Sequence, residues 1–139
     1  MRLFQKRFSL IELMVVISIL GILATVVSIN VMDHLSAARQ TKAKVQIQQF
    51  TESLGFYFID NHTYPSTSEG LQKLAEKPAK KTNPYMDAIP VDPWSRPYEY
   101  RAPTQHKFDI ISYGRDGTEG GEGEDMDIKS WEIVETQSQ

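Results

Sequence analysis

The sequence predicts an α+β protein, in which a long N-terminal helix carries a small C-terminal domain with a short helix, a loop-rich segment and a small antiparallel β-sheet. Three observations predict this fold class. An uncharged, largely apolar stretch of 20 residues runs from Leu13 to Met32. Helically spaced apolar residues follow, and no proline occurs between Phe8 and about Asp60. The rest of the chain contains the prolines and the short segments whose composition is typical of β-strands.

The apolar stretch predicts a transmembrane helix over residues 8–32. The preceding string MRLFQKR contains three basic residues and no acid, which orients the N-terminus towards the cytoplasm. About 20 apolar residues at ~1.5 Å each span the ~30 Å hydrocarbon core of a bilayer. A cleaved secretory signal is the alternative, but its apolar region of ~7–15 residues ends at an A-x-A site that is absent here.

Residues 33–60 are predicted to continue the helix as an amphipathic segment, and residues 61–139 to form a globular domain. The apolar positions of the continuation are Leu35, Ala38, Val45, Ile47, Phe50, Leu54, Phe58 and Ile59. Beyond Asp60 the pattern predicts a short helix from Ser66 to Pro78, strands near Tyr98–Arg101 and Phe108–Ser112, and a terminal element around Trp131 and Ile133.

Composition excludes several classes of function. The net charge of -3 and an acidic cluster argue against nucleic-acid binding. The chain has no cysteine, so no disulfide stabilises it. His34, His62 and His106 are scattered and match no catalytic motif. Asp92, followed by a proline, is interpreted as a turn residue and Trp94 as a core aromatic residue. The chain is therefore not expected to be an enzyme.

Glu12 is the one acidic residue within the predicted anchor. An ionised carboxylate in a bilayer costs about 2.5 kcal/mol or more unless it is paired. Two interpretations remain open: Glu12 stays hydrated near the lipid headgroups, or it pairs with a positive group of a neighbouring chain. Gly21 is similarly ambiguous, as a small residue for helix packing or as a point of local melting.

An acidic, glycine-rich loop over residues 113–127 is a candidate metal site. Six carboxylates crowd into it: Asp116, Glu119, Glu122, Glu124, Asp125 and Asp127. Clustered carboxylates repel one another unless a cation balances them, and oxygen ligands on flexible turns suit Ca²⁺. A solvated loop without a bound ion is the alternative.

The string KRFSLIELMVVISILGILA resembles the N-terminal signal of type IV pilins and pseudopilins. The resemblance implies that a prepilin peptidase removes the basic leader, residues 1–7, between Arg7 and Phe8, and that Phe8 is then methylated. Glu12 falls at the fifth mature position, where the family's Glu pairs with a neighbouring subunit's N-terminus. The chain has Arg7 where the family has Gly.

The remainder resembles the major pseudopilin of type II secretion. TYPSTSEGLQKL is similar to its YPT-EGL segment, DPWSRPYEY to its DPWG-PY motif with Ser95 in place of Gly, and FDIISYGRDGTEGGEGEDMDIKSW to its SxGxDG…DDIxxW tail. The resemblance implies one structural Ca²⁺ bound by Asp116, Asp125 and Asp127, with Glu124 as a substitute, and by the carbonyl oxygens of Tyr113 and Thr118.

The resemblance further implies a subunit anchored in the inner membrane by a single span, with its C-terminal domain in the periplasm. Such subunits polymerise with copies of themselves into a periplasmic pseudopilus that drives protein export. They work with minor pseudopilins and an inner-membrane secretion platform. The alternatives are a type IV pilin of a surface filament, a membrane-anchored Ca²⁺-binding module and a membrane-anchored hydrolase.

Overall fold

The computed structural model describes residues 8–79 and 81–136, which fall into two compact units divided after Leu35. Helix α1 (Leu10–Asn61) contributes to both units. The predicted leader, residues 1–7 with Arg7, lies outside the described residues.

Local hydrogen bonds define both ends of α1. At its start, the Ser9 hydroxyl accepts from the Glu12 backbone N–H at 3.3 Å, and the Ser9 carbonyl accepts from the Leu13 N–H at 3.2 Å. A serine side chain placed this way satisfies a backbone donor that the first turn leaves open. At its end, His62 adopts a left-handed conformation with φ +60°, which stops the helix after Asn61.

The first unit is an apolar helix. Large apolar side chains of Phe8–Met32, where the structure describes them, are between 45% and 78% exposed. Within the described residues, α1 is the helix whose length and apolar composition are sufficient to cross a membrane. The residues of this unit that the structure describes therefore form no core that could cover the apolar surface.

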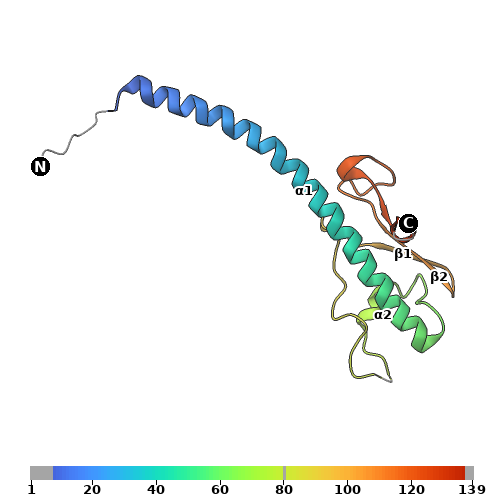
Figure 1. Ribbon diagram of the computed structural model, residues 1–139. Helices are drawn as coiled ribbons and strands as arrows, with labels where there is room; N and C mark the ends of the chain where they lie inside the picture. The colour runs from blue at the N-terminus through green and yellow to red at the C-terminus, as the bar shows by residue number, and fades with distance from the viewer. Residues whose placement is uncertain (1–7, 80, 137–139) are drawn as a thin grey trace, which may run out of the picture. The chain divides into compact units, whose positions relative to one another are not determined.

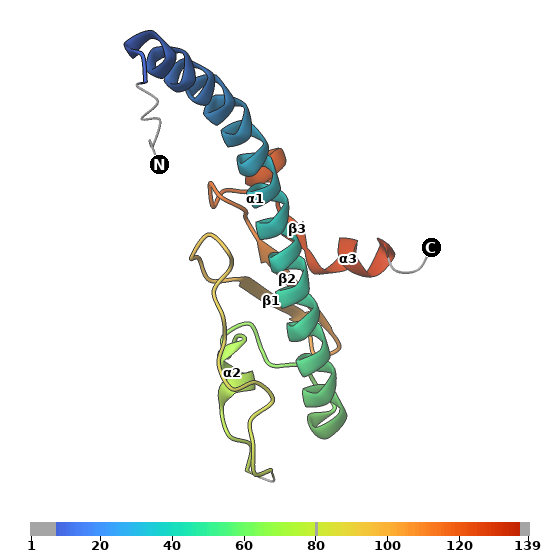
Figure 2. The ribbon, with the colours of Figure 1, turned by 60° about the vertical axis from the view of Figure 1, so that its left-hand side comes forward.

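The second unit consists of the second half of α1 and a small α+β domain (Figure 1). Its further elements are α2 (Gln72–Ala75), β1 (Glu99–Thr104), β2 (Lys107–Ser112), the 3₁₀ turn η1 (Gly123–Asp125), β3 (Ile128–Lys129) and α3 (Ser130–Thr136). The strands form one antiparallel sheet in the order β1-β2-β3. Both views show the sheet beside the second half of α1 (Figures 1 and 2).

The core of this unit lies between α1 and the sheet. Ala43, Ile47, Phe50 and Leu54 form one fully buried stripe of α1, at intervals of four, three and four residues. They pack against buried residues of the rest of the domain: Leu71, Leu74, Tyr98, Tyr100, Ile110 and Ile128. Fully burying a side chain such as Ile, Leu or Phe contributes about 1.5–3 kcal/mol, so this stripe holds the domain on the helix.

The predicted apolar face of α1 is partly wrong. Ile47, Phe50 and Leu54 are buried as predicted, but Val45 and Ile59 are 46% and 68% exposed. Val45 lies two residues from both Ala43 and Ile47, which places it about 200° around the helix from the buried face. Ala43 was not predicted, whereas Ala38, which was predicted, is exposed.

Three smaller elements differ from the prediction. The expected helix from Ser66 to Pro78 is only the single turn α2. Ser66 and Glu69 form a reciprocal cap, with the Ser66 N–H donating to Glu69 Oε2 at 2.8 Å and the Glu69 N–H donating to the Ser66 hydroxyl at 3.3 Å, but Gly70 then takes φ +63° and interrupts the helix. Strand β1 extends to Thr104 across Pro103, and the pairing register is irregular there. Strand β3 was not predicted.

Candidate functional site

Glu12 occupies the third position of α1, and its backbone N–H is capped by Ser9. A carboxylate in the first turn of a helix is favoured by the positive end of the helix dipole. The pattern S-x-x-E is a recognised start signal for a helix, so the sequence itself marks this helix start at Ser9. The ion pairs of the described residues include none with Glu12.

Asp92 organises the turn that faces the acidic loop. One carboxylate oxygen accepts hydrogen bonds from the backbone N–H groups of Trp94 at 3.0 Å and Arg96 at 2.8 Å. The other accepts from the Ser112 hydroxyl at 2.8 Å, at the end of β2. Asp92 is only 3% exposed. The turn predicted at this residue is confirmed, and it fixes Arg96 next to the start of the loop.

The two ends of the acidic loop run side by side. The Arg115 N–H donates to the Glu124 carbonyl at 2.9 Å. A Cβ atom at Gly114 would lie 2.6 Å from that same carbonyl oxygen, so only glycine allows this approach. Tyr113 and Thr118, expected to contribute carbonyl oxygens, lie at the beginning and in the first turn of the loop.

Asp116 and Asp127 both accept hydrogen bonds from residues of the loop. Asp116 accepts from the Thr118 N–H at 3.1 Å and the Thr118 hydroxyl at 2.8 Å, and these bonds hold the pKa of Asp116 below its usual value. Asp127 Oδ2 accepts from the Gly120 N–H at 3.0 Å. Asp127 Oδ1 is buried and, among the described residues, has no hydrogen-bond donor.

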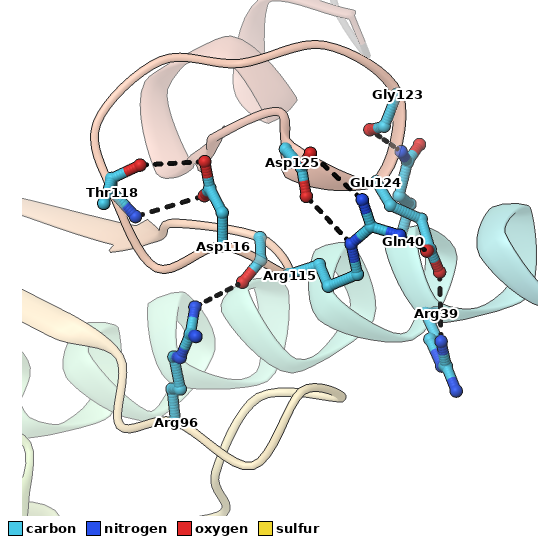
Figure 3. A network of polar contacts seen from close by, with 10 residues as sticks. Arg39, Gln40, Arg96, Arg115, Asp116, Thr118, Gly123, Glu124 and Asp125 are labelled. Atoms are coloured by element: carbon cyan, nitrogen blue, oxygen red, sulfur yellow. Dashed lines mark hydrogen bonds and ion pairs between the residues drawn. The ribbon is translucent and has the colours of Figure 1, made fainter.

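Glu124 and Asp125 are already paired with arginines (Figure 3). Arg115 binds both oxygens of Asp125, at 3.0 Å and 3.2 Å, and Glu124 at 3.2 Å. Arg39 of α1 binds the other oxygen of Glu124 at 3.0 Å. A third arginine, Arg96, donates to the Gly114 carbonyl at 3.3 Å. No feature of the sequence pattern had indicated these three arginines.

The oxygen atoms of the loop suit a calcium ion, but the ion pairs that the carboxylates make in the structure do not bring them together around one. The unpartnered, buried oxygen of Asp127 is the kind of group that a cation would satisfy. Within the described residues, however, no three Asp, Glu or His side chains converge closely enough to hold a metal. Asp125, an expected ligand, is occupied by Arg115.

The exposed apolar helix with its acidic first turn, followed by a small domain packed on the same helix, defines a membrane-anchored structural subunit of the pilin type. Residues 8–28 match the prokaryotic N-terminal methylation motif, and residues 30–131 match the family described as type II secretion system protein G. The chain therefore belongs to the family of type II secretion system protein G, the major pseudopilins.

Individual relatives agree with this family. The chain is 45% identical to the type II secretion system core protein G of Pseudomonas aeruginosa, over 92% of this chain and 96% of that protein. It is 40% identical to the core protein G of Vibrio cholerae, over 96% of each. The crystal structure of the major pseudopilin from the type 2 secretion system of enterohaemorrhagic Escherichia coli matches with a TM-score of 0.58 at 32% identity, covering 74% of this chain and 95% of that one.

Membership in this family confirms several predictions. The α+β fold with a long N-terminal helix and a small three-stranded sheet is as expected, and the family is structural and not enzymatic. The N-terminal helix anchors the chain at the inner membrane, with the pseudopilin domain in the periplasm. The methylation motif also implies partners of the pilus-assembly and peptidase kind.

Proposed function

We propose that a prepilin peptidase removes residues 1–7 by cutting between Arg7 and Phe8, that Phe8 is methylated, and that the mature chain polymerises into a periplasmic pseudopilus. In this proposal residues 8–32 are first the membrane anchor and then the filament core. Residues 33–60 continue the helix into the periplasmic domain, residues 61–139. Minor pseudopilins and an inner-membrane platform are the expected assembly partners.

The exposed apolar surface of the first unit is the observation that carries this proposal. Side chains such as Phe8, Leu10 and Ile11 are more than 70% exposed, and no other described residue of the unit covers them. Such a surface is stable in lipid or against other apolar helices. Transfer from the membrane to a bundle of like helices keeps it covered, so polymerisation through this segment preserves its apolar contacts.

Glu12 gives the polymer its register in this proposal. Its position in the first turn of α1 places it next to the mature N-terminus at Phe8. An unpaired carboxylate in the apolar filament core is costly, whereas one paired with a neighbour's amino group is compensated. The pairing therefore favours one axial offset between neighbouring helices over all others.

The test is filament assembly in cells that express the chain with the other components of a type II secretion machine. We expect Glu12→Gln to abolish sedimentable filaments while the chain remains in the membrane. Glu52→Gln is the matched control, because Glu52 is an exposed glutamate of the same helix outside the apolar segment. Normal filaments from Glu12→Gln would contradict the proposed pairing.

We also propose that the loop of residues 113–127 binds one Ca²⁺ through Asp116, Asp127 and either Asp125 or Glu124, with carbonyl oxygens from about Tyr113 and Thr118. The buried, unpartnered oxygen of Asp127 supports this proposal. When bound, the ion would supply the positive charge that six carboxylates in a short loop require.

Calorimetric titration of the full chain in detergent micelles with Ca²⁺ tests this site. We expect one ion per chain, and a loss of at least about tenfold in affinity with Asp127→Asn, because removal of a charged ligand weakens a calcium site strongly. Asp87→Asn, at an exposed aspartate outside the loop, is the control. Equal affinity of Asp127→Asn and the wild type would contradict the assignment.

A further inference from the structure

We propose that Arg115 is a resident counter-ion of the acidic loop, which holds Asp125 and Glu124 when no metal is bound and competes with a divalent cation for Asp125. The pairing involves contacts within the described loop, whereas the competition rests on the proposed calcium site.

The contacts of Arg115 are specific in geometry. Its Nε lies 3.0 Å from Asp125 Oδ1 and its Nη2 lies 3.2 Å from Asp125 Oδ2, which is a two-pronged pairing of guanidinium and carboxylate. Its Nη1 lies 3.2 Å from Glu124 Oε2. One arginine thus binds two of the loop's carboxylates at once, as Figure 3 shows.

The same contacts connect the loop to helix α1. The second oxygen of Glu124 accepts from Arg39 at 3.0 Å, and the Gln40 side-chain amide donates to the carbonyl oxygen of Gly123. Glu124 is therefore held between an arginine of the helix and an arginine of the loop, and its side chain is only 17% exposed. Arg115 completes a chain of ion pairs that keeps the loop end against the helix.

Arg115 and a bound cation compete for the negative charge of Asp125. Both oxygens of Asp125 accept from the guanidinium, so a cation that coordinates that side chain would lie beside the positive charge of Arg115. A guanidinium next to a divalent ion repels it. Arg115 therefore opposes binding of the ion, and this repulsion lowers the apparent affinity.

Asp127 is a carboxylate of the loop whose hydrogen bonding is incomplete. Its Oδ1 is buried with no donor among the described residues, while Oδ2 accepts from Gly120 within the loop. Lys129 Nζ is 3.9 Å from Oδ2. The described loop thus contains one carboxylate with both oxygens bound by arginine, Asp125, and one carboxylate with a buried oxygen that has no donor, Asp127, as expected for a loop that exchanges an internal cation for an external one.

The test uses the full chain in detergent micelles, with Ca²⁺ alone as the probe and Arg115→Gln as the variant. Arg101→Gln is the matched control: Arg101 pairs with Glu99 outside the loop, and its side chain is 56% exposed against 59% for Arg115. Both variants remove one positive charge. Arg115→Lys, which keeps the charge but cannot pair with both carboxylate oxygens through two N–H groups, provides a second variant.

We expect Arg115→Gln to bind Ca²⁺ roughly three- to fivefold more tightly than the wild type and Arg101→Gln, the effect of losing one exposed pairing. In EDTA, its domain should melt about 2–5 °C lower than that of Arg101→Gln. Arg115→Lys should fall between wild type and Arg115→Gln. Trp94 and Trp131, the only tryptophans, report unfolding of this domain specifically.

The outcomes separate the two parts of the account. Unchanged or weaker Ca²⁺ binding by Arg115→Gln would overturn the competition, although the calcium site itself would stand. Absence of Ca²⁺ binding by every chain would overturn the calcium proposal and the competition together. A melting temperature in EDTA equal to that of Arg101→Gln would overturn the role of Arg115 as a resident counter-ion.

Discussion

Replacement of Asp92 by alanine should destabilise the periplasmic domain by about 3 kcal/mol. The buried carboxylate accepts three hydrogen bonds, from the N–H groups of Trp94 and Arg96 and from the hydroxyl of Ser112. Alanine leaves all three donors without their acceptor, and each loss costs about 1 kcal/mol or more in a buried site. For a domain of this size, that free energy corresponds to a fall of about 10–20 °C in melting temperature.

Asp92→Asn separates the loss of charge from the loss of hydrogen bonds. Its amide oxygen can still accept from both backbone N–H groups, and its amide nitrogen can donate to the hydroxyl oxygen of Ser112. We therefore expect a cost of only about 1 kcal/mol, from replacing charged by neutral hydrogen bonds.

Unfolding of the full chain in detergent micelles, followed by tryptophan fluorescence against urea, measures these differences. Asp87→Ala is the control, because Asp87 is exposed and lies in the same proline-rich segment. A cost below about 1 kcal/mol for Asp92→Ala, close to that of Asp87→Ala, would refute the role of Asp92 in holding the turn.

Backbone strain, close packing and pH provide three further tests of the domain. Ser95→Gly should stabilise it by about 0.5–1 kcal/mol in urea unfolding, because Ser95 has φ +66°; a loss of stability would contradict this. Gly114→Ala should cost about 2 kcal/mol or more, because its Cβ would lie 2.6 Å from a carbonyl oxygen, whereas Gly55→Ala, with free space around it inside α1, should stabilise the domain by up to about 1 kcal/mol. Hydrogen bonds lower the pKa of Glu99 and Asp116, so their stabilisation is present above about pH 4 and disappears as the pH falls through the lowered values; a melting temperature that stays constant from pH 6 to pH 3 would contradict this.

The main features of the fold could be predicted because local signals express them. A long proline-free apolar run, its helical continuation and the two hairpin strands all have a period or a composition of their own. The turn at Asp92 was predictable for the same reason. Strand β3 was not, because two residues show no alternation and depend on pairing with β2.

The candidate loop was recognisable by composition, but its internal pairing was not. Six carboxylates with interspersed glycines identify a loop in need of positive charge. In the structure, arginines supply this positive charge. Arg39 lies 85 positions away from its partner Glu124, and Arg115 reaches Asp125 only because the loop folds back on itself. Long-range pairs of this kind leave no periodic trace in a sequence.

The processing of the N-terminus tests the central claim most directly, because assembly through α1 requires a mature chain that begins next to Glu12. The measurement is the intact mass, with N-terminal fragmentation, of the chain purified from membranes of cells that contain a prepilin peptidase. The account predicts residues 8–139 with a methyl group on Phe8. A chain that still begins at Met1 would contradict cleavage after Arg7, and with it the proposed assembly.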